Sequence, residues 1–153
     1  MKLMSLFLMV IPFFCFSQLR TERFTDWENR QQQDPRPTVI HIYTDWCSVC
    51  KIEQFKLNQD LELLELINDN FYFIPFEAEK MRETVRFQGK TFRYLPNGNS
   101  GIHELALALS KNKSKPVYPL WIILDKNQNL VDYHEGIFTP EELKKKLSET
   151  SGF

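Results

Sequence analysis

The chain has 153 residues, of which 42% are hydrophobic and 25% are charged, a composition typical of one globular domain with its own core. The 13 phenylalanines supply large rings for that core. The formal net charge is −1, so no basic excess indicates a nucleic-acid partner and no acidic tail indicates a binding arm.

The start of the chain has the pattern of a leader. Lys2 is followed by an apolar run from Leu3 to Phe16 and by the small residue Ser17. This pattern is typical of a secretory signal peptide, which we expect to be cut after Ser17. The run is shorter than the roughly 20 residues of a membrane span, although an uncleaved N-terminal anchor is the alternative. Lipid attachment at Cys15 is a second alternative, which the bulky residues before it disfavour.

The mature domain is expected to span residues 18–153 and to contain both helices and strands. Hydrophobic periodicity and turn residues predict its elements in this order: helix 20–33, strand 38–44, a bent or broken helix 47–69, strand 71–76, a hairpin 85–94, helix 102–110, strands 119–125 and 130–136, and helix 139–147. Residues 95–101 and 111–116 are expected to be loops. The order predicts a layered α/β domain whose sheet starts parallel and ends in an antiparallel hairpin.

Several helix starts carry side chains that can cap them. The expected caps are Thr25 or Asp26, Asn58, and Asn99 or Ser100. The last helix has the strongest start signal, since Thr139 can cap it, Pro140 suits its first position and Glu142 completes a capping box.

Cys47 and Cys50 lie where strand 38–44 turns into a helix. With the leader removed they are the remaining cysteines, and a pair this close closes too small a loop to staple a domain. An export signal implies a compartment in which disulfides can form. At a helix N-terminus, free N–H groups and the dipole stabilise a Cys47 thiolate, the nucleophile of disulfide exchange. Cys50, nearly one turn further on, is then placed to resolve the mixed disulfide.

Two other interpretations of the pair stay open. A structural zinc site normally has four ligands, and the three histidines form no second paired motif, although folding could gather them. The cysteines could also be buried and unreactive. We expect no metal and no dissolved cofactor, because the dithiol itself is the redox group.

The segment from Tyr43 to Lys51, YTDWCSVCK, resembles the W-C-x-x-C-K active-site segment of the thioredoxin superfamily. It is similar to the periplasmic C-terminal domain of the membrane thiol:disulfide interchange reductases. The resemblance covers roughly residues 27–147. It implies a thioredoxin fold, with a central mixed sheet flanked by helices and an insert over approximately residues 80–115.

The resemblance extends to Pro119, which matches the cis-proline facing the cysteines, and to Gly136, which matches a glycine of the closing strand. It implies that the bond before Pro119 is cis. It also implies that Tyr118 pairs with an extended substrate and that Trp46 helps to shape the groove.

His41 departs from the family, which commonly carries a buried acid at this position, six residues before the first cysteine. Our hypothesis is that the imidazole of His41 accepts the proton of Cys50. The alternative is a core histidine that is hydrogen-bonded to backbone. Glu77 and Glu79 are interpreted as solvated charges at a strand end. The insert either covers the rim of the active site or is plain decoration.

The resemblance implies a thiol–disulfide oxidoreductase that acts on protein thiols and disulfides, with reduction the favoured direction. A non-catalytic protein-binding module on the same scaffold is the alternative. We expect a periplasmic or secreted monomer that a membrane electron donor recharges.

Overall fold

The structure is a computed structural model that describes residues 18–112 and 114–151. The expected leader, its cleavage site and Cys15 lie outside the described residues.

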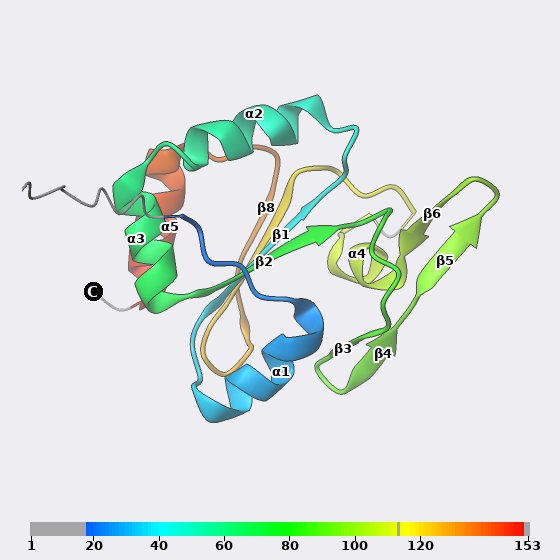
Figure 1. The fold of residues 1–153 in the computed structure, drawn as a ribbon, viewed down its shortest axis with the longest axis horizontal. Coiled ribbons are helices and arrows are strands. Elements are labelled where there is room, and N and C mark those ends of the chain that lie inside the picture. Colours follow the sequence, from blue (N-terminus) through cyan, green and yellow to red (C-terminus); the bar gives the residue numbers. More distant parts are fainter. Residues whose placement is uncertain (1–17, 113, 152–153) are drawn as a thin grey trace, which may run out of the picture.

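A four-stranded mixed sheet in the order β2-β1-β7-β8 forms the centre of the molecule (Figure 1). Its strands are β1 (Thr38–Tyr43), β2 (Tyr72–Glu77), β7 (Leu120–Leu124) and β8 (Leu130–Glu135). β1 pairs parallel with β2, whereas β7 is antiparallel to both β1 and β8. The predicted sheet, parallel at its start and antiparallel at its end, is therefore confirmed.

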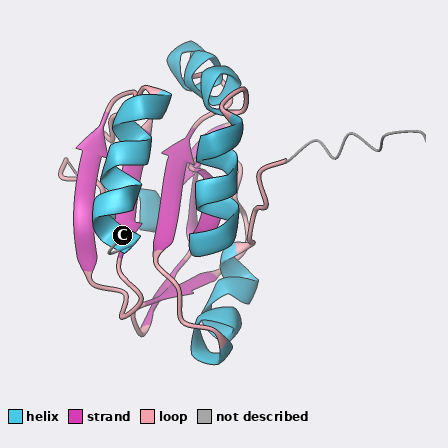
Figure 2. Cartoon of the chain, turned by 90° about the vertical axis from the view of Figure 1, so that its left-hand side faces the viewer, coloured by secondary structure: helices cyan, strands magenta, loops and turns pink. Residues whose placement is uncertain are grey.

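Helices cover both faces of this sheet, because side chains of successive strand residues point to opposite sides. Figure 2 shows helices packed along the strands. On one face, Val39 of β1 joins a core cluster with α3 (Leu61–Asn70) and α5 (Pro140–Ser151). On the other face, Ile40 joins a cluster with α1 (Phe24–Gln33) and α4 (Glu104–Leu109). The two clusters make the layered α/β domain that the sequence predicts.

The long helical segment is broken, as predicted, into α2 (Ser48–Leu57) and α3. The predicted cap of its second part is wrong, since Asn58 ends α2. Asp60 caps α3 instead, and its Oδ1 accepts a hydrogen bond from the Leu63 N–H at 2.9 Å. Where α3 starts depends on the geometry of the turn between the two helices, and the spacing of polar residues in the sequence does not reveal that geometry.

The expected caps of α1 are also wrong. The helix begins after Arg23, which makes no side-chain capping bond. Asp26 lies inside the first turn, where its carboxylate accepts a hydrogen bond from Arg23 Nε at 2.8 Å. Acidic side chains are favourable in a first turn as well as at a cap, so the sequence alone did not separate the two positions.

The insert contains the predicted hairpin, formed by β3 (Val85–Phe87) and β4 (Lys90–Phe92). Gly89 in its turn has a φ of 75°, a conformation that glycine adopts without strain. Val85 and Phe87 are buried in the cluster that contains α1, so this part of the insert belongs to the core.

The second half of the insert differs from the prediction. β5 (Tyr94–Asn97) and β6 (Ser100–His103) form another hairpin where a loop was expected. α4 begins only at Glu104, and its cap is His103, whose Nδ1 accepts a hydrogen bond from the Leu105 N–H at 3.1 Å. Asn99 and Ser100 are therefore not the cap, because the backbone there is already engaged in the second hairpin.

The capping box of α5 is confirmed. The Thr139 N–H donates to Glu142 Oε2 at 2.8 Å, and the Glu142 N–H donates to Thr139 Oγ1 at 3.2 Å. Lys144 then pairs with Asp60 at 3.1 Å and with Glu62 at 2.9 Å, which ties α5 to the start of α3. Among the described helices, none has the length and apolar character needed to cross a membrane.

Candidate active site at the start of helix α2

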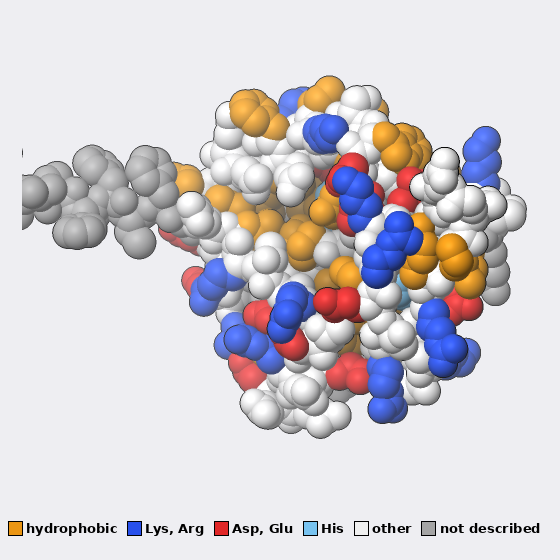
Figure 3. Space-filling view, turned by 45° about the vertical axis from the view of Figure 1, so that its right-hand side comes forward, with side chains coloured by type: hydrophobic (Ala, Val, Ile, Leu, Met, Phe, Trp, Pro, Cys, Tyr) orange, Lys and Arg blue, Asp and Glu red, His pale blue; other side chains and the backbone are white. Residues whose placement is uncertain are grey.

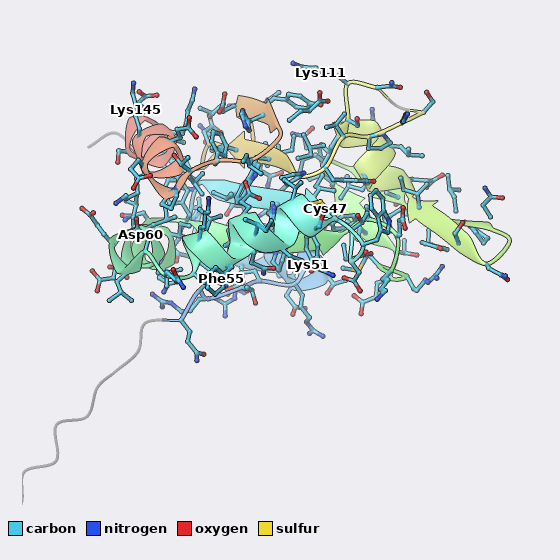
Figure 4. All side chains as sticks on the ribbon, turned by 90° about the horizontal axis from the view of Figure 1, so that it is seen from above. Cys47, Lys51, Phe55, Asp60, Lys111 and Lys145 are labelled. Carbon is cyan, nitrogen blue, oxygen red and sulfur yellow. A yellow bond between two sulfur atoms is a disulfide. The ribbon has the colours of Figure 1, made fainter. Side chains whose placement is uncertain are left out.

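Cys47 is the N-cap of α2, directly after the turn that follows β1 (Figure 4). Its N–H donates to the Thr44 carbonyl at 3.1 Å, and its Sγ accepts a hydrogen bond from the Cys50 N–H at 3.2 Å. Cys47 and Cys50 are joined by a disulfide. Of the two residues Cys47 is the more exposed, at 6% against 2% for Cys50. The structure thus gives Cys47 the helix-terminal position that favours a thiolate.

Glu77, at the end of β2, holds the turn before Cys47. Its carboxylate accepts hydrogen bonds from the Asp45 N–H at 2.9 Å, from the Glu79 N–H at 2.8 Å and from the Lys80 N–H. Glu77 lies opposite Tyr43 because β1 and β2 run parallel and end at the same edge. Its interpretation as a solvated charge is therefore wrong, and the parallel pairing of the strands was the signal that could have corrected it.

Glu79 fixes the ring of Trp46. Trp46 Nε1 donates to Glu79 Oε2 at 2.9 Å, although 66% of the tryptophan is exposed. The interpretation of Glu79 as a solvated charge is also wrong. Lys80, which follows Glu79 in the loop after β2, pairs with Asp45 in the turn after β1, and the hydrogen bond to that carboxylate raises the pKa of Lys80. The negative charge of Asp45 beside the cysteines is thus offset by a neighbouring ammonium group.

Tyr118 and Pro119 come directly before β7, and Tyr118 contacts Trp46. The Tyr118–Pro119 peptide bond is cis, as predicted. The rings of Trp46 and Tyr118 meet edge to face, with centroids 6.1 Å apart. Burial, aided by the charges of Glu79 and Glu77, raises the pKa of the Tyr118 hydroxyl and keeps it neutral. The structure therefore brings together the predicted groove residues Trp46 and Tyr118.

Gly136 is placed beside Pro119 through the backbone. Its N–H donates to the Pro119 carbonyl at 2.8 Å. The φ of Gly136 is 107°, a region that side-chain-bearing residues rarely occupy. This contact joins the end of β8 to the start of β7 at the predicted positions.

His41 is buried on the α2 side of the sheet and stacks on Trp121, with ring centroids 4.1 Å apart. Its Nε2 lies 3.2 Å from Oε2 of Glu53, a fully buried carboxylate on α2. The alternative interpretation expected a hydrogen bond from His41 to backbone. The structure instead gives His41 a hydrogen bond to an acid.

Glu53 is a site residue that the sequence analysis missed. Its Oε1 accepts hydrogen bonds from Trp121 Nε1 at 3.0 Å and from the Phe138 N–H at 2.7 Å. Both carboxylate oxygens thus have partners, as a buried carboxylate requires. Glu53 follows Cys50 by three residues, so both face inward from the same helix side. The sequence signal that could have identified Glu53 was this three-residue spacing from Cys50, in a helix with few inward-facing positions.

The three histidines do not converge. His103 caps α4 and His134 lies in β8, where its ring stacks on Phe138. Among residues 18–112 and 114–151, no three His, Cys, Asp or Glu side chains are grouped as a metal site would require.

Comparisons with solved structures identify related folds. A structure named DsbH oxidoreductase matches with a TM-score of 0.62 at 12% identity, over 98% of this chain and 96% of that one. The oxidised C-terminal domain of Neisseria meningitidis DsbD matches with a TM-score of 0.51 at 14% identity, over 80% and 88%. The exposed lipoprotein thioredoxin Etrx1 of Streptococcus pneumoniae strain TIGR4 matches with a TM-score of 0.51 at 15% identity, over 77% and 87%.

No curated protein matches the sequence. The profile of the thioredoxin-like domain family matches residues 26–151, which include β1, the CSVC segment and the strands that follow it. The chain therefore belongs to the thioredoxin-like domain family.

Proposed function

We propose that the protein is a thiol–disulfide oxidoreductase that reduces disulfides of partner proteins through Cys47 and Cys50. The observation that carries this proposal is the position of Cys47, which caps α2 and forms a disulfide with Cys50 in the first turn of that helix. A structural crosslink would gain little from so small a loop, whereas a redox pair needs this proximity.

In the first step, the Cys47 thiolate attacks a sulfur atom of the substrate disulfide. A mixed disulfide forms between Cys47 and one substrate sulfur, and the other substrate sulfur leaves as a thiolate. The α2 N-terminus stabilises the attacking Cys47 thiolate, because its N–H groups and dipole favour negative charge there.

In the second step, Cys50 loses its proton and its thiolate attacks Cys47 Sγ. The Cys47–Cys50 disulfide forms, and the second substrate thiolate leaves. Two electrons have then passed from the protein dithiol to the substrate disulfide. We assign the Cys50 proton to His41, whose Nε2 is held by Glu53, a residue on the same inward side of α2 as Cys50.

The groove beside the cysteines is assigned to Trp46, Tyr118 and Pro119. Trp46 is held by its hydrogen bond to Glu79 and by contact with the Tyr118 ring, so its indole presents a fixed wall to an approaching peptide. The backbone of Tyr118 would pair with an extended segment of the substrate.

The proposed setting is outside the cytoplasm, reached through a leader that ends at Ser17. Disulfides form there, and a reductant must return two electrons to the oxidised pair after each turnover. A dithiol of a membrane electron carrier is the proposed donor, and the protein would meet it and its substrates as a monomer.

A Cys50→Ser variant tests the attack step directly. We expect it to accumulate mixed disulfides through Cys47, because no resolving thiol remains, and mass spectrometry of non-reduced complexes would detect them. A Cys47→Ser variant is the matched control and should trap none. If partners stay bound when both cysteines are serine, the protein is a binding module and the proposal fails.

The direction of electron flow is tested by the reduction potential of the Cys47–Cys50 pair. Equilibration with glutathione or dithiothreitol, read by alkylation, should give a value nearer thioredoxin, about −270 mV, than the oxidant DsbA, about −120 mV. A value at the oxidising end would reverse the proposed direction while leaving the exchange chemistry intact.

A further inference from the structure

α2 is exposed around most of its circumference. Only Cys50, Glu53 and Leu57 are buried, and they form one narrow inward stripe. On the outside, Val49 is 48% exposed, Ile52 57% and Phe55 65%. These are large fractions for apolar side chains on a single helix. In Figure 3, hydrophobic side chains appear along the upper edge of the molecule, where Figure 1 places α2.

The apolar residues of α2 form a line that starts at the cysteines. Residues three apart lie on neighbouring positions of a helix surface, so Val49, Ile52 and Phe55 follow one another away from Cys47. In Figure 4, which looks at the molecule from above, α2 runs across the middle of the view, with Phe55 further along it than Cys47. We call Val49, Ile52 and Phe55 the α2 stripe.

The exposed charges on α2 itself are of one sign, and the one acidic residue in the turn before it, Asp45, is paired with Lys80. All ten residues of α2 are described, and its exposed charged residues are Lys51 and Lys56, since Glu53 is buried. A complementary surface would therefore carry apolar residues at its centre and acidic residues at its margins.

Cys47 itself offers almost no contact area, since it is 6% exposed. A protein that exchanges a disulfide with it must also cover the surrounding surface, because even weak redox encounters bury several hundred Å² on each side, within a total below about 1,200 Å². In the direction of α2, that surface is the α2 stripe.

We propose that the α2 stripe docks the redox partner protein, one whose surface beside its disulfide carries an apolar centre and acidic margins. This inference rests on the proposed function and names the partner surface of the same site. The occupant is a protein that brings a disulfide, because the stripe begins inside the CSVC segment. A lipid bilayer or a second copy seated there would cover the cysteines and keep a substrate away.

The probe is a short amphipathic peptide with leucines at i, i+3, i+4 and i+7 and glutamates at the margins. Its single terminal cysteine is supplied as a mixed disulfide with cysteamine. The matched peptide has serine in place of each leucine, and hydroxyethyl disulfide serves as the small substrate without a docking surface. The measured quantity is the ratio of the second-order rate constants for the peptide and for hydroxyethyl disulfide, with the full reduced chain.

We expect this ratio to fall about fivefold or more when the double variant Ile52→Ser, Phe55→Ser removes the apolar contact. The control is the double variant Leu130→Ser, Val131→Ser in β8. These two side chains are 61% and 48% exposed, so their loss removes a comparable apolar surface and should leave the ratio unchanged. Lys56→Glu should lower the ratio for the acidic peptide, and the serine peptide should give a low ratio with every variant.

An equal ratio for the Ile52/Phe55 variant and the wild type would overturn the docking proposal. Two other results would overturn it if the ratio of rate constants did not change. One is that the wild type binds phosphatidylglycerol vesicles and only the Ile52/Phe55 variant does not. The other is that the wild type forms a dimer in sedimentation equilibrium and only that variant does not. Fluorescence anisotropy with a cysteine-free peptide separates docking from chemistry. Binding that needs Ile52 and Phe55 supports the surface even if the wild type fails to reduce hydroxyethyl disulfide, a failure that would count against the proposed function alone.

Discussion

His41 and Glu53 form a buried, hydrogen-bonded pair one helical turn beyond Cys50. Trp121 Nε1 and the Phe138 N–H both donate to the carboxylate, so the acid is anchored from two elements besides its own helix. This anchoring places Nε2 of the His41 ring against the acid, and the ring itself stacks on Trp121. Breaking a pair of this kind leaves an uncompensated buried group, so both partners are sensitive positions.

A His41→Leu variant should slow the resolution of mixed disulfides by on the order of 100-fold, because it removes the proposed proton acceptor for Cys50. The shape of the pH–rate profile should change as well, because Cys50 would then lose its proton to solvent. Stopped-flow tryptophan fluorescence over a pH series measures both. His134→Leu, which changes a histidine in β8, is the control and should keep the wild-type profile. An unchanged profile in His41→Leu would contradict the base role.

Tyr118 carries a second residue-scale consequence. Among the described side chains, its hydroxyl is one of the few buried groups without a hydrogen-bond partner. Because an unpaired buried hydroxyl costs free energy, Tyr118→Phe should raise the free energy of unfolding by up to about 1 kcal/mol. Urea denaturation measures the change. A loss of stability would mean that the hydroxyl is paired, and Tyr94→Phe, at another buried unpaired hydroxyl, gives a second reading of the same effect.

At the level of secondary-structure elements, the sequence predicts the order well and the starts poorly. The capping box of α5 was predictable because Thr139, Pro140 and Glu142 all favour the same register. The starts of α1, α3 and α4 were not, since each offers several polar residues within one turn. Only the tertiary contacts, such as the pairing of Lys144 with Asp60, select among them.

Asp60 gives a pH-dependent prediction for α3. The hydrogen bond from the Leu63 N–H, and then the nearby Lys144, lower the pKa of its carboxyl below the ordinary value. A carboxyl whose folded pKa is depressed adds stability above its unfolded pKa, about 3.9, and loses it as the pH falls through the folded value. Asp60→Ala should therefore cost about 1 kcal/mol of unfolding free energy at neutral pH, and less once the wild-type carboxyl is protonated.

Urea denaturation of Asp60→Ala and wild type at neutral and at acidic pH measures this difference. Asn58→Ala, at the cap position that the sequence suggests, is the matched control. It should cost less than Asp60→Ala, because Asn58 ends α2 and does not start α3. A difference between Asp60→Ala and wild type that stayed constant down to acid pH would contradict the assignment of the effect to the carboxylate.

At the scale of the whole molecule, the fold class and the role of the cysteine pair could be predicted from the sequence. The residues that hold the site in place could not. The CSVC segment and the change from strand to helix are local, so they are visible in the order of residues. The three supporting glutamates are far in sequence from the residues that they hydrogen-bond. Glu53 contacts His41, 12 positions away; Glu77 contacts Asp45, 32 away; and Glu79 contacts Trp46, 33 away. Such contacts depend on how strands pair and on which helix face turns inward.

The insert is likewise more than the decoration that its composition allowed. Val85 and Phe87 are buried, and Phe87 meets the rings of Phe24 and Trp27 with centroids 5.8 and 5.9 Å away. Phe87→Ala should therefore lower the free energy of unfolding by about 3 kcal/mol or more, as for other buried aromatic truncations. Arg86→Ala, an exposed residue between them, is the control and should change it by less than about 0.5 kcal/mol. Urea midpoints decide the comparison, and equal midpoints would show that the insert is independent of the core.

The cap on α2 makes the redox state of the protein readable from one amide. The Cys50 N–H points at Cys47 Sγ, which is a disulfide sulfur in the oxidised protein and, in the proposed mechanism, a thiolate in the reduced one. A thiolate accepts a hydrogen bond more strongly than a neutral sulfur, since charged acceptors make the stronger bonds. Reduction should therefore slow hydrogen–deuterium exchange at Cys50, so this single amide would report which way the electrons have gone.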